Sequence, residues 1–275
     1  MDAAIPFQRR SSNGTAAGAF GQDLYEGIAS WRLWTTFGWN DIRQRYRRSV
    51  LGPFWMTISM SVLIIVLGFL YSRIFHADIE TYLPYLALGF ICWGFISSSI
   101  SETCEAFRES ERIIKQIKIP FSMHIFRVVW RNLIVFFHTA ILFVPIALFF
   151  GIPLRPVTLL VVPGLALLFI NLTWLGLTLA ILSTRFRDVP PIVATLLQIT
   201  MFATPIMWPV SAVGDQTFII NINPVYHLIE LVRTPLLGDE VMALTWIVAV
   251  GMAVVGWLTA LILFRRVGHQ IVYWL

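Results

Sequence analysis

The sequence has 275 residues, of which 57% are hydrophobic and only 13% are charged. Soluble domains carry about 25% charged residues, so this composition excludes an ordinary water-soluble globule and indicates a protein that crosses the membrane several times. The net charge of +5 resides mainly in arginines beside apolar stretches, which is typical of membrane topology rather than nucleic-acid binding. The two cysteines, Cys92 and Cys104, form neither a disulfide framework nor a zinc motif.

The N-terminal part precedes the first apolar stretch. Residues 1–23 are expected to form a flexible cytoplasmic tail, because residues 11–21 are small and polar and lack the apolar core of a cleavable signal. Residues 24–48 place apolar residues at helical spacing and end in several arginines, which predicts an amphipathic helix in the cytoplasmic interface. A plain membrane anchor is the simpler interpretation of this helix, and direct handling of a substrate is the alternative.

Six stretches without charged side chains are long enough to cross a hydrocarbon core about 30 Å thick, which takes roughly 20 helical residues. They predict an all-α polytopic membrane protein whose transmembrane domain covers residues 49–264. Residues 265–275 are expected to form a cytoplasmic tail. The six transmembrane helices are expected at about residues 53–75, 82–101, 122–150, 157–184, 190–208 and 241–264.

The basic residues predict the orientation, because Lys and Arg near span ends stay in the cytoplasm. With both termini inside, 17 of the 20 basic residues are cytoplasmic and only Arg73, Arg155 and Arg233 lie outside. We therefore expect a multi-pass protein with both termini in the cytoplasm.

Residues 102–118, between the second and third spans, are dense in charge. Acidic and basic residues recur at i,i+3 or i,i+4 spacing, which favours a helix that projects into the cytoplasm, and Pro120 marks its boundary with the third span. A solvated connector is the simpler interpretation. We favour a helix that docks onto another protein, because the other loops are short and need no charged helix of this length.

Residues 209–239 precede the last span and are expected outside. Their apolar piece, Gln216 to Ile229, has 14 residues and is too short to span, so we expect a re-entrant periplasmic segment. Prolines break this segment into helical pieces that could form a movable plug over a pore. Glu230 and Arg233 lie three apart and are expected to neutralise each other on one helical turn.

Several kinds of active site lack their motifs. Both lysines, Lys115 and Lys118, follow isoleucine, so there is no phosphate-binding loop that would hydrolyse ATP. No span carries the paired acids of a proton relay or a sodium site, and Asp188 stands alone where a glycosyltransferase would need clustered carboxylates. His124 and His138 are interpreted as packed histidines. We expect no catalytic residue and no metal site.

Aromatic residues are frequent in the spans, and most are expected to face lipid or the interface. Those that line a channel would suit sugar rings, which stack on flat aromatic faces. The candidate channel aromatics are Trp55, Phe69, Tyr71, Phe90, Trp93, Phe202 and Trp208.

The order of these features is more specific than any one of them. An amphipathic segment ending in DIRQRYRRSVLGPFW, six spans, a charged helix after the second span, TPIMWP and NPVYHLIELVRTPLLG resemble the permease subunits of type-2 ABC exporters (the ABC-2 family). The resemblance is greatest to exporters of O-antigen and related polysaccharides. It covers about residues 24–264 and rests most on Arg45–Trp55 and Asn223–Gly238.

The resemblance implies a homodimer in the bacterial inner membrane, bound to two copies of a separate ABC ATPase subunit. The complex would move lipid-linked O-antigen polysaccharide from cytoplasm to periplasm. This chain would be a transport subunit rather than an enzyme, with membrane lipids but no nucleic acid as further partners. It would hold no cofactor, because ATP and Mg²⁺ would bind the ATPase. Closure of the ATPase would push the charged helix and separate the facing first and fifth spans.

The resemblance also assigns residues to roles. Coupling to the ATPase falls on the charged helix and on the turn after the fourth span: Glu105, Phe107, Arg108, Glu109, Glu111, Arg112, Lys115, Arg187 and Asp188. A periplasmic gate falls on Pro209, Asn223, Pro224, Tyr226, Glu230, Arg233 and Gly238.

Two other functions stay open at this point. One is export of capsular polysaccharide, teichoic acid or a small drug by a member of the same family. The other is an integral-membrane enzyme that acts on lipid-linked sugar, which the purified chain would reveal by forming product without any ATPase.

Overall fold

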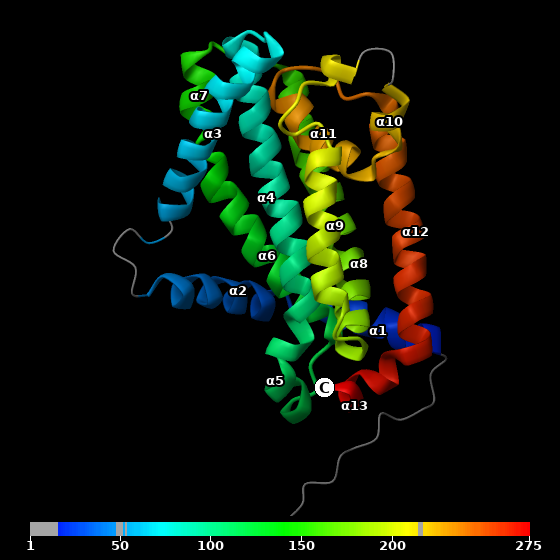
Figure 1. Cartoon of the computed structure of the whole chain (residues 1–275). Helices are drawn as coiled ribbons and strands as arrows, with labels where there is room; N and C mark the ends of the chain where they lie inside the picture. The colour runs from blue at the N-terminus through cyan, green and yellow to red at the C-terminus, as the bar shows by residue number, and fades with distance from the viewer. Residues whose placement is uncertain (1–15, 48–51, 53, 214–216) are drawn as a thin grey trace, which may run out of the picture.

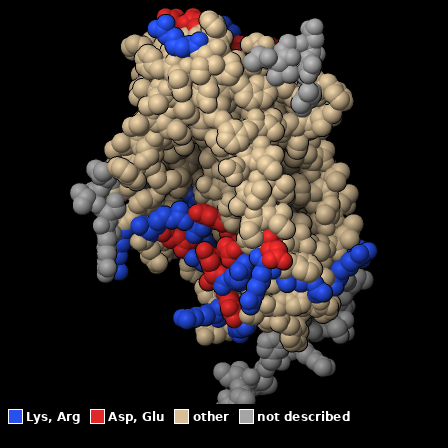
Figure 2. Space-filling view, viewed as in Figure 1, with Lys and Arg blue, Asp and Glu red and all other residues tan. Residues whose placement is uncertain are grey.

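The computed structural model describes residues 16–47, 52, 54–213 and 217–275, and every regular element in this part of the chain is a helix. Long helices stand side by side in an upright bundle, with short helices at both ends (Figure 1). Most charged side chains form a band at one end, which we call the charged end, and a smaller group lies at the opposite end (Figure 2). The charged end holds α1 (Ala16–Ala29), α2 (Trp31–Tyr46), α5 (Glu111–Gln116) and α13 (Ile271–Trp274), and the opposite end holds η2 (Val210–Val213), α10 (Thr217–Ile222) and α11 (Pro224–Leu236).

Five helical segments among the described residues are long and apolar enough to cross a membrane. This result confirms the prediction of an all-α polytopic membrane protein. The five segments are α3 (Phe54–Phe75), α4 (Ile79–Glu109), α6 (Phe121–Ala140) with α7 (Phe143–Phe149), η1 (Pro156–Leu160) with α8 (Val161–Arg185), and α12 (Ala243–Val267) with η3 (Gly268–Gln270) and α13.

The sixth expected span, residues 190–208, is shorter in the structure. Helix α9 (Val189–Ala203) has 15 residues, which at 1.5 Å per residue is about 22 Å and less than the hydrocarbon core of about 30 Å. Beyond Ala203 the backbone becomes extended at Thr204 and then turns at Pro205, whose ring cannot continue the helix. A count of six spans therefore stays a prediction.

Helix α4 lies at the centre of the bundle and contacts α3, α6, α8, α9 and α11. In the most apolar 18-residue stretch of α4, 78% of the residues are buried, compared with 11% in that of α3. Helix α4 therefore belongs to the core, and α3 lies at the periphery of the bundle. The Asp78 side chain caps its N-terminus by accepting a hydrogen bond from the Glu80 N–H. At the other end the helix continues to Glu109, so the expected separate helix over 102–118 is instead the end of α4, a break at Ser110, and α5.

Both chain ends differ from the expected tails. Residues from Ala16 onward form α1, in which Phe20 packs against Trp257 and Phe264 and gives this segment an apolar anchor. The expected single helix over 24–48 is therefore two helices, α1 and α2, which meet at Ser30.

Residues 1–15, 48–51 and 53, including part of the RRSVLGPF motif, lie outside the described residues. At the C-terminus α13 is docked, since Ile271 is fully buried.

A buried carboxylate attaches α1 to the bundle. Asp23 accepts hydrogen bonds from the backbone N–H groups of Phe121 and Ser122, at 2.9 and 3.0 Å. These are the first residues of α6, whose N–H groups have no partner within the helix. Asp23 therefore acts as an N-cap supplied by another helix, which explains why residues 16–23 are ordered against the bundle.

Two single glycines allow close helix packing without a Gly-x-x-x-Gly motif. A Cβ atom added at Gly164 in α8 would meet the Leu231 carbonyl oxygen of α11 at 2.3 Å. One added at Gly256 in α12 would meet the Trp174 ring of α8 at 2.0 Å. Small residues let helix backbones approach in this way in membrane proteins. Helix α8 is thus fitted closely between α11 and α12.

The substitution Gly164→Val tests this packing. We expect it to destabilise the protein by about 1–3 kcal/mol, because the added carbons force α8 and α11 apart. The measurement is the thermal unfolding midpoint of the purified protein in detergent. The matched control is Gly251→Val, since a Cβ at this position on α12 would meet nothing within 4 Å. Equal midpoints for the two variants would contradict the close approach.

Candidate functional site

The expected coupling residues lie at the charged end, on the last turns of α4 and on α5. Glu105 pairs with Arg108 at 3.0 Å, and Glu111 pairs with Lys115 at 2.7 Å. All four side chains are about 40% exposed, so the two pairs contribute little stability and can exchange partners. Glu109 and Arg112, also three residues apart, lie on either side of the break at Ser110, and both are exposed.

Phe107 was expected on the coupling surface and is not there. Its side chain is 1% exposed and packs against Phe121 and His124, with ring centroids 5.4 and 6.4 Å away. The assignment is wrong because this face of α4 turns towards α6. The exposed apolar residue near α5 is Ile117, at 58%. Phe107 instead holds the base of α4 on α6.

Arg187 and Asp188 lie in the turn between α8 and α9 and are exposed, as a docking role requires. The same turn exposes Phe186, which the sequence analysis did not single out. Arg185 lies over the rings of both Phe186 and Trp274, at 5.4 and 4.8 Å from their centroids. The cation therefore ties the C-terminal residues to this turn.

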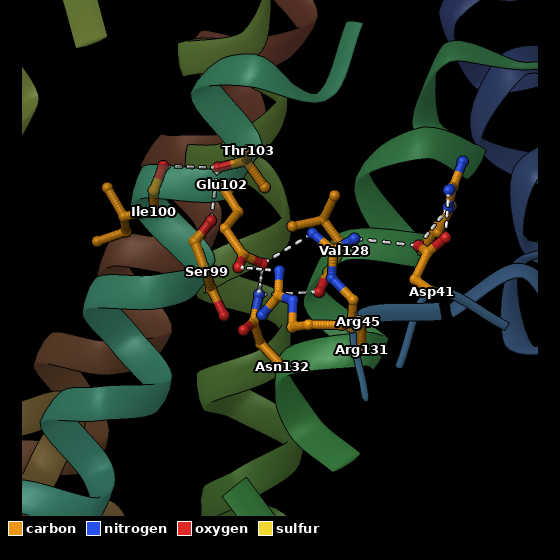
Figure 3. A network of polar contacts seen from close by, with 10 residues as sticks. Asp41, Arg45, Ser99, Ile100, Glu102, Thr103, Val128, Arg131 and Asn132 are labelled. Carbon is orange, nitrogen blue, oxygen red and sulfur yellow. Dashed lines mark hydrogen bonds and ion pairs between the residues drawn. The ribbon is translucent and has the colours of Figure 1, made fainter. Parts of the chain in front are cut away.

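Behind this surface, a network of charged side chains joins three helices (Figure 3). Glu102 of α4 accepts hydrogen bonds from Arg45 of α2 at 2.9 Å, and from Arg131 and Asn132 of α6 at 2.8 and 2.7 Å. Asp41 of α2 accepts from Arg131 at 3.0 Å. Arg131 thus bridges two carboxylates that belong to different helices.

The centre of this network is shielded from water, whereas its rim is open. The Arg131 side chain is 8% exposed, and that of Arg45 is 45% exposed. Asp41 also accepts two hydrogen bonds from Arg127, and the one that Nε donates is 2.7 Å long. Burial alone would lower the pKa of the Arg45 guanidinium, but the hydrogen bond and charge of Glu102 raise it above its ordinary value. The Arg45 guanidinium is therefore charged at any physiological pH.

Helix α2 has a second polar face, which points away from this network. Asn40, Arg43, Gln44 and Arg47 follow one another at helical spacing and line a hollow of about 410 Å³. Arg43 and Arg45 are thus two residues apart but face different surroundings. Neither the network nor the hollow was predicted from the sequence, although the arginine cluster was its visible signal.

The candidate channel aromatics separate into three groups by exposure. Trp55, Phe69 and Phe202 are exposed. Tyr71 is half-buried and stacks on Phe75, and Trp208 is half-buried and donates a hydrogen bond to the Phe202 carbonyl. Phe90 and Trp93, in contrast, are buried in the core around α4. Their expected place on a channel wall is wrong, because they face the inside of the subunit.

At the opposite end, the expected gate residue Arg233 is fully buried. It forms an ion pair with Glu230, as expected, and also donates a hydrogen bond to the Pro205 carbonyl at 2.8 Å. Its guanidinium lies 3.9 Å from the centre of the Tyr85 ring. The Tyr85 hydroxyl donates to the same Pro205 carbonyl at 2.7 Å. Arg233 therefore connects α11, α4 and the turn that follows α9.

Other gate residues hold the same region in place. The Asn223 side chain caps α11 by accepting from the Val225 N–H at 3.0 Å, and it donates to the Thr204 hydroxyl at 2.8 Å. Tyr82 donates to the Met207 carbonyl. Pro209 is half-buried, Pro224 opens α11 and Tyr226 is buried within it. Gly238, at a φ of +88°, accepts a hydrogen bond from Arg155 at 3.1 Å. The described residues named here are thus held by hydrogen bonds and packing on both sides of the gap at 214–216.

His227 was not among the expected gate residues. It is buried, and its ring nitrogens lie 3.1 Å from the Thr245 hydroxyl and 2.9 Å from the Asn221 carbonyl. It thereby joins α11 to the start of α12.

Comparisons with known proteins agree with this arrangement. The family described as ABC-2 type transporter matches residues 32–237. The O-antigen export system permease protein RfbA of Myxococcus xanthus is 27% identical over 198 residues, which cover 68% of this chain and 74% of that protein. The protein of the same name from Klebsiella pneumoniae is 22% identical over 222 residues, covering 78% and 86%.

Arg233→Met tests the buried ion pair. We expect a loss of about 3–5 kcal/mol of stability, because Glu230 is left partly buried with no opposite charge. The double variant Arg233→Met with Glu230→Gln is expected to be more stable than the single variant. Thermal unfolding in detergent measures both, with Arg108→Met as the control that breaks an exposed pair. If the double variant is the less stable of the two, charge pairing is not what holds this site.

Proposed function

Because this chain belongs to the ABC-2 type transporter family, we propose that it is the membrane-spanning permease subunit of an ATP-driven exporter of lipid-linked O-antigen polysaccharide. The family match over residues 32–237 carries this proposal, since it runs from α2 to the end of α11. The relatives from Myxococcus xanthus and Klebsiella pneumoniae, both named as O-antigen export permeases, favour this substrate over capsular polysaccharide, teichoic acid or a drug. Transport would run from cytoplasm to periplasm.

The energy would come from a separate ABC ATPase subunit, which would bind ATP and Mg²⁺. The surface formed by α5 and the turn after α8 suits such a partner. It exposes Ile117 and Phe186 among charged side chains, and an apolar centre within a polar rim is typical of protein interfaces. The charged end would then face the cytoplasm of a bacterial inner membrane, as the positive-inside rule requires, with both termini inside.

A second copy of the chain would complete the passage. Helix α9 exposes Ile192, Leu196, Ile199 and Phe202, which share one face of the helix, and most of α3 is exposed as well. These surfaces are apolar and can face either lipid or another copy. We assign them to the dimer, so that Trp55, Phe69 and Phe202 would line the route of the sugar chain. The outer segment, from Pro209 to Gly238, would close its far end.

Depletion of the protein tests the transport function directly. We expect lipid-linked polysaccharide to accumulate on the cytoplasmic side and O-antigen to disappear from the cell surface. Surface polysaccharide that persists at its normal level would contradict the proposal.

The double charge reversal Arg112→Glu with Lys115→Glu tests the docking surface. Both side chains are exposed, so we expect normal insertion and folding but at least a tenfold loss of export, because the partner meets the opposite charge. The measurements are surface polysaccharide in cells and ATP hydrolysis by the purified complex. The control is Arg73→Glu, an exposed charge reversal at the opposite end. Normal export in the double variant would remove the coupling role of α5.

A further inference from the structure

Helix α4 is attached to α2 and α6 through one carboxylate. Glu102 lies on the same continuous helix as Glu109, about two turns before the break that leads to α5. It accepts hydrogen bonds from Arg45, Arg131 and Asn132, so it is a fully bonded point of attachment. A displacement of the charged end of α4 must therefore either carry its partners along or break these bonds.

The middle of α2 and its last turn are held by different helices. Its middle packs on α6, where a Cβ at Gly38 would meet the Arg127 carbonyl at 3.2 Å and where Asp41 binds Arg127 and Arg131. Its last turn reaches α4, through Arg45 and Glu102. Among the described residues, Arg45 is the member of α2 that forms a hydrogen bond to α4.

The last turn of α2 also touches the next transmembrane helix. The Tyr46 hydroxyl contacts the Met56 sulfur, which lies in the first turn of α3. Arg45 and Tyr46 are neighbours in sequence, so the end of α2 is joined to α4 on one side and to α3 on the other. A contiguous path thus leads from α5 through Glu102, Arg45 and Tyr46 to α3.

We propose that Arg45 and Glu102 are positioning residues that transmit movement of the ATPase-docking end of α4 to α3, the helix with the most exposed apolar face. This inference rests on the proposed function. Helix α3 is the receiver in this proposal, because little of it is buried and it can shift with little loss of packing, whereas α4 and α6 share the core. Loss of the pair would leave the ATPase docked and active while the first turn of α3, which Tyr46 contacts, no longer follows it; the direct packing of α3 on α4 lies further along, where Gly68 meets Leu83.

The variant Arg45→Ala separates transmission from folding. Arg45 is 45% exposed, and without it Glu102 keeps its bonds to Arg131 and Asn132, so the buried centre of the network stays paired. We expect at least a fivefold fall in surface O-antigen, while ATP hydrolysis by the purified complex with its ATPase stays within twofold of wild type. Coupling between sites usually amounts to fivefold or more.

Two further variants make the test specific. Arg45→Lys keeps the charge and is expected to recover at least half of the export. Arg43→Ala removes the same charge from the other face of α2 and is expected to export within twofold of wild type. Equal losses in Arg43→Ala and Arg45→Ala would show that the arginines act only through their charge at the membrane surface, and would overturn the proposal.

The remaining outcomes distinguish a failure of the transmission role from a failure of the proposed function. Normal export by Arg45→Ala, or a parallel fall in export and ATP hydrolysis, would overturn the transmission role. A wild-type strain whose surface O-antigen does not depend on this protein would instead overturn the proposed function itself. The two failures are therefore distinguishable.

Discussion

Polar side chains on α4 connect this helix to its neighbours at both ends of the molecule. At the charged end Glu102 bonds to α2 and α6, and at the opposite end Tyr85 bonds to the turn after α9 and lies against Arg233. The helix between them is continuous over 31 residues and mostly buried. A continuous helix with every backbone group bonded inside it is the structure that an apolar environment favours. The two ends are thus connected by one long and mostly buried helix.

The buried arginines illustrate what such connections require. Arg131 and Arg233 are shielded from water; Arg131 binds two carboxylates, and Arg233 binds one carboxylate and the Pro205 carbonyl. Removal of a charge from water costs more than an ion pair usually returns, so these pairs add specificity of arrangement rather than stability. Arg131 joins α6 to α2 and α4, whereas Arg233, whose carboxylate partner lies on its own helix, joins α11 to the turn after α9 and to α4 through the Pro205 carbonyl and the Tyr85 ring. They mark the places where the relative position of helices matters most.

Local patterns in the sequence predict this structure most accurately. Long apolar stretches between charged residues predicted the membrane spans, because the length of a span depends only on consecutive residues. Prediction is least accurate at the chain ends and on individual side chains. Phe20 and Asp23 are anchored by residues about 240 and 100 positions away, respectively, which no local pattern reveals. Phe90, Trp93 and Phe107 turned inward for the same reason, since the partner helix decides which face is buried.

Composition and order of segments alone determined the class of protein, the approximate spans and the resemblance to ABC exporters, because these depend on hydropathy and short motifs along the chain. Only the tertiary structure decided that the charged segment is an extension of α4, that Arg45 meets Glu102, and that Arg233 reaches the Pro205 carbonyl. The physical reason is that a charged side chain in a membrane protein needs an opposite charge nearby. Which residue supplies that charge depends on how the helices pack.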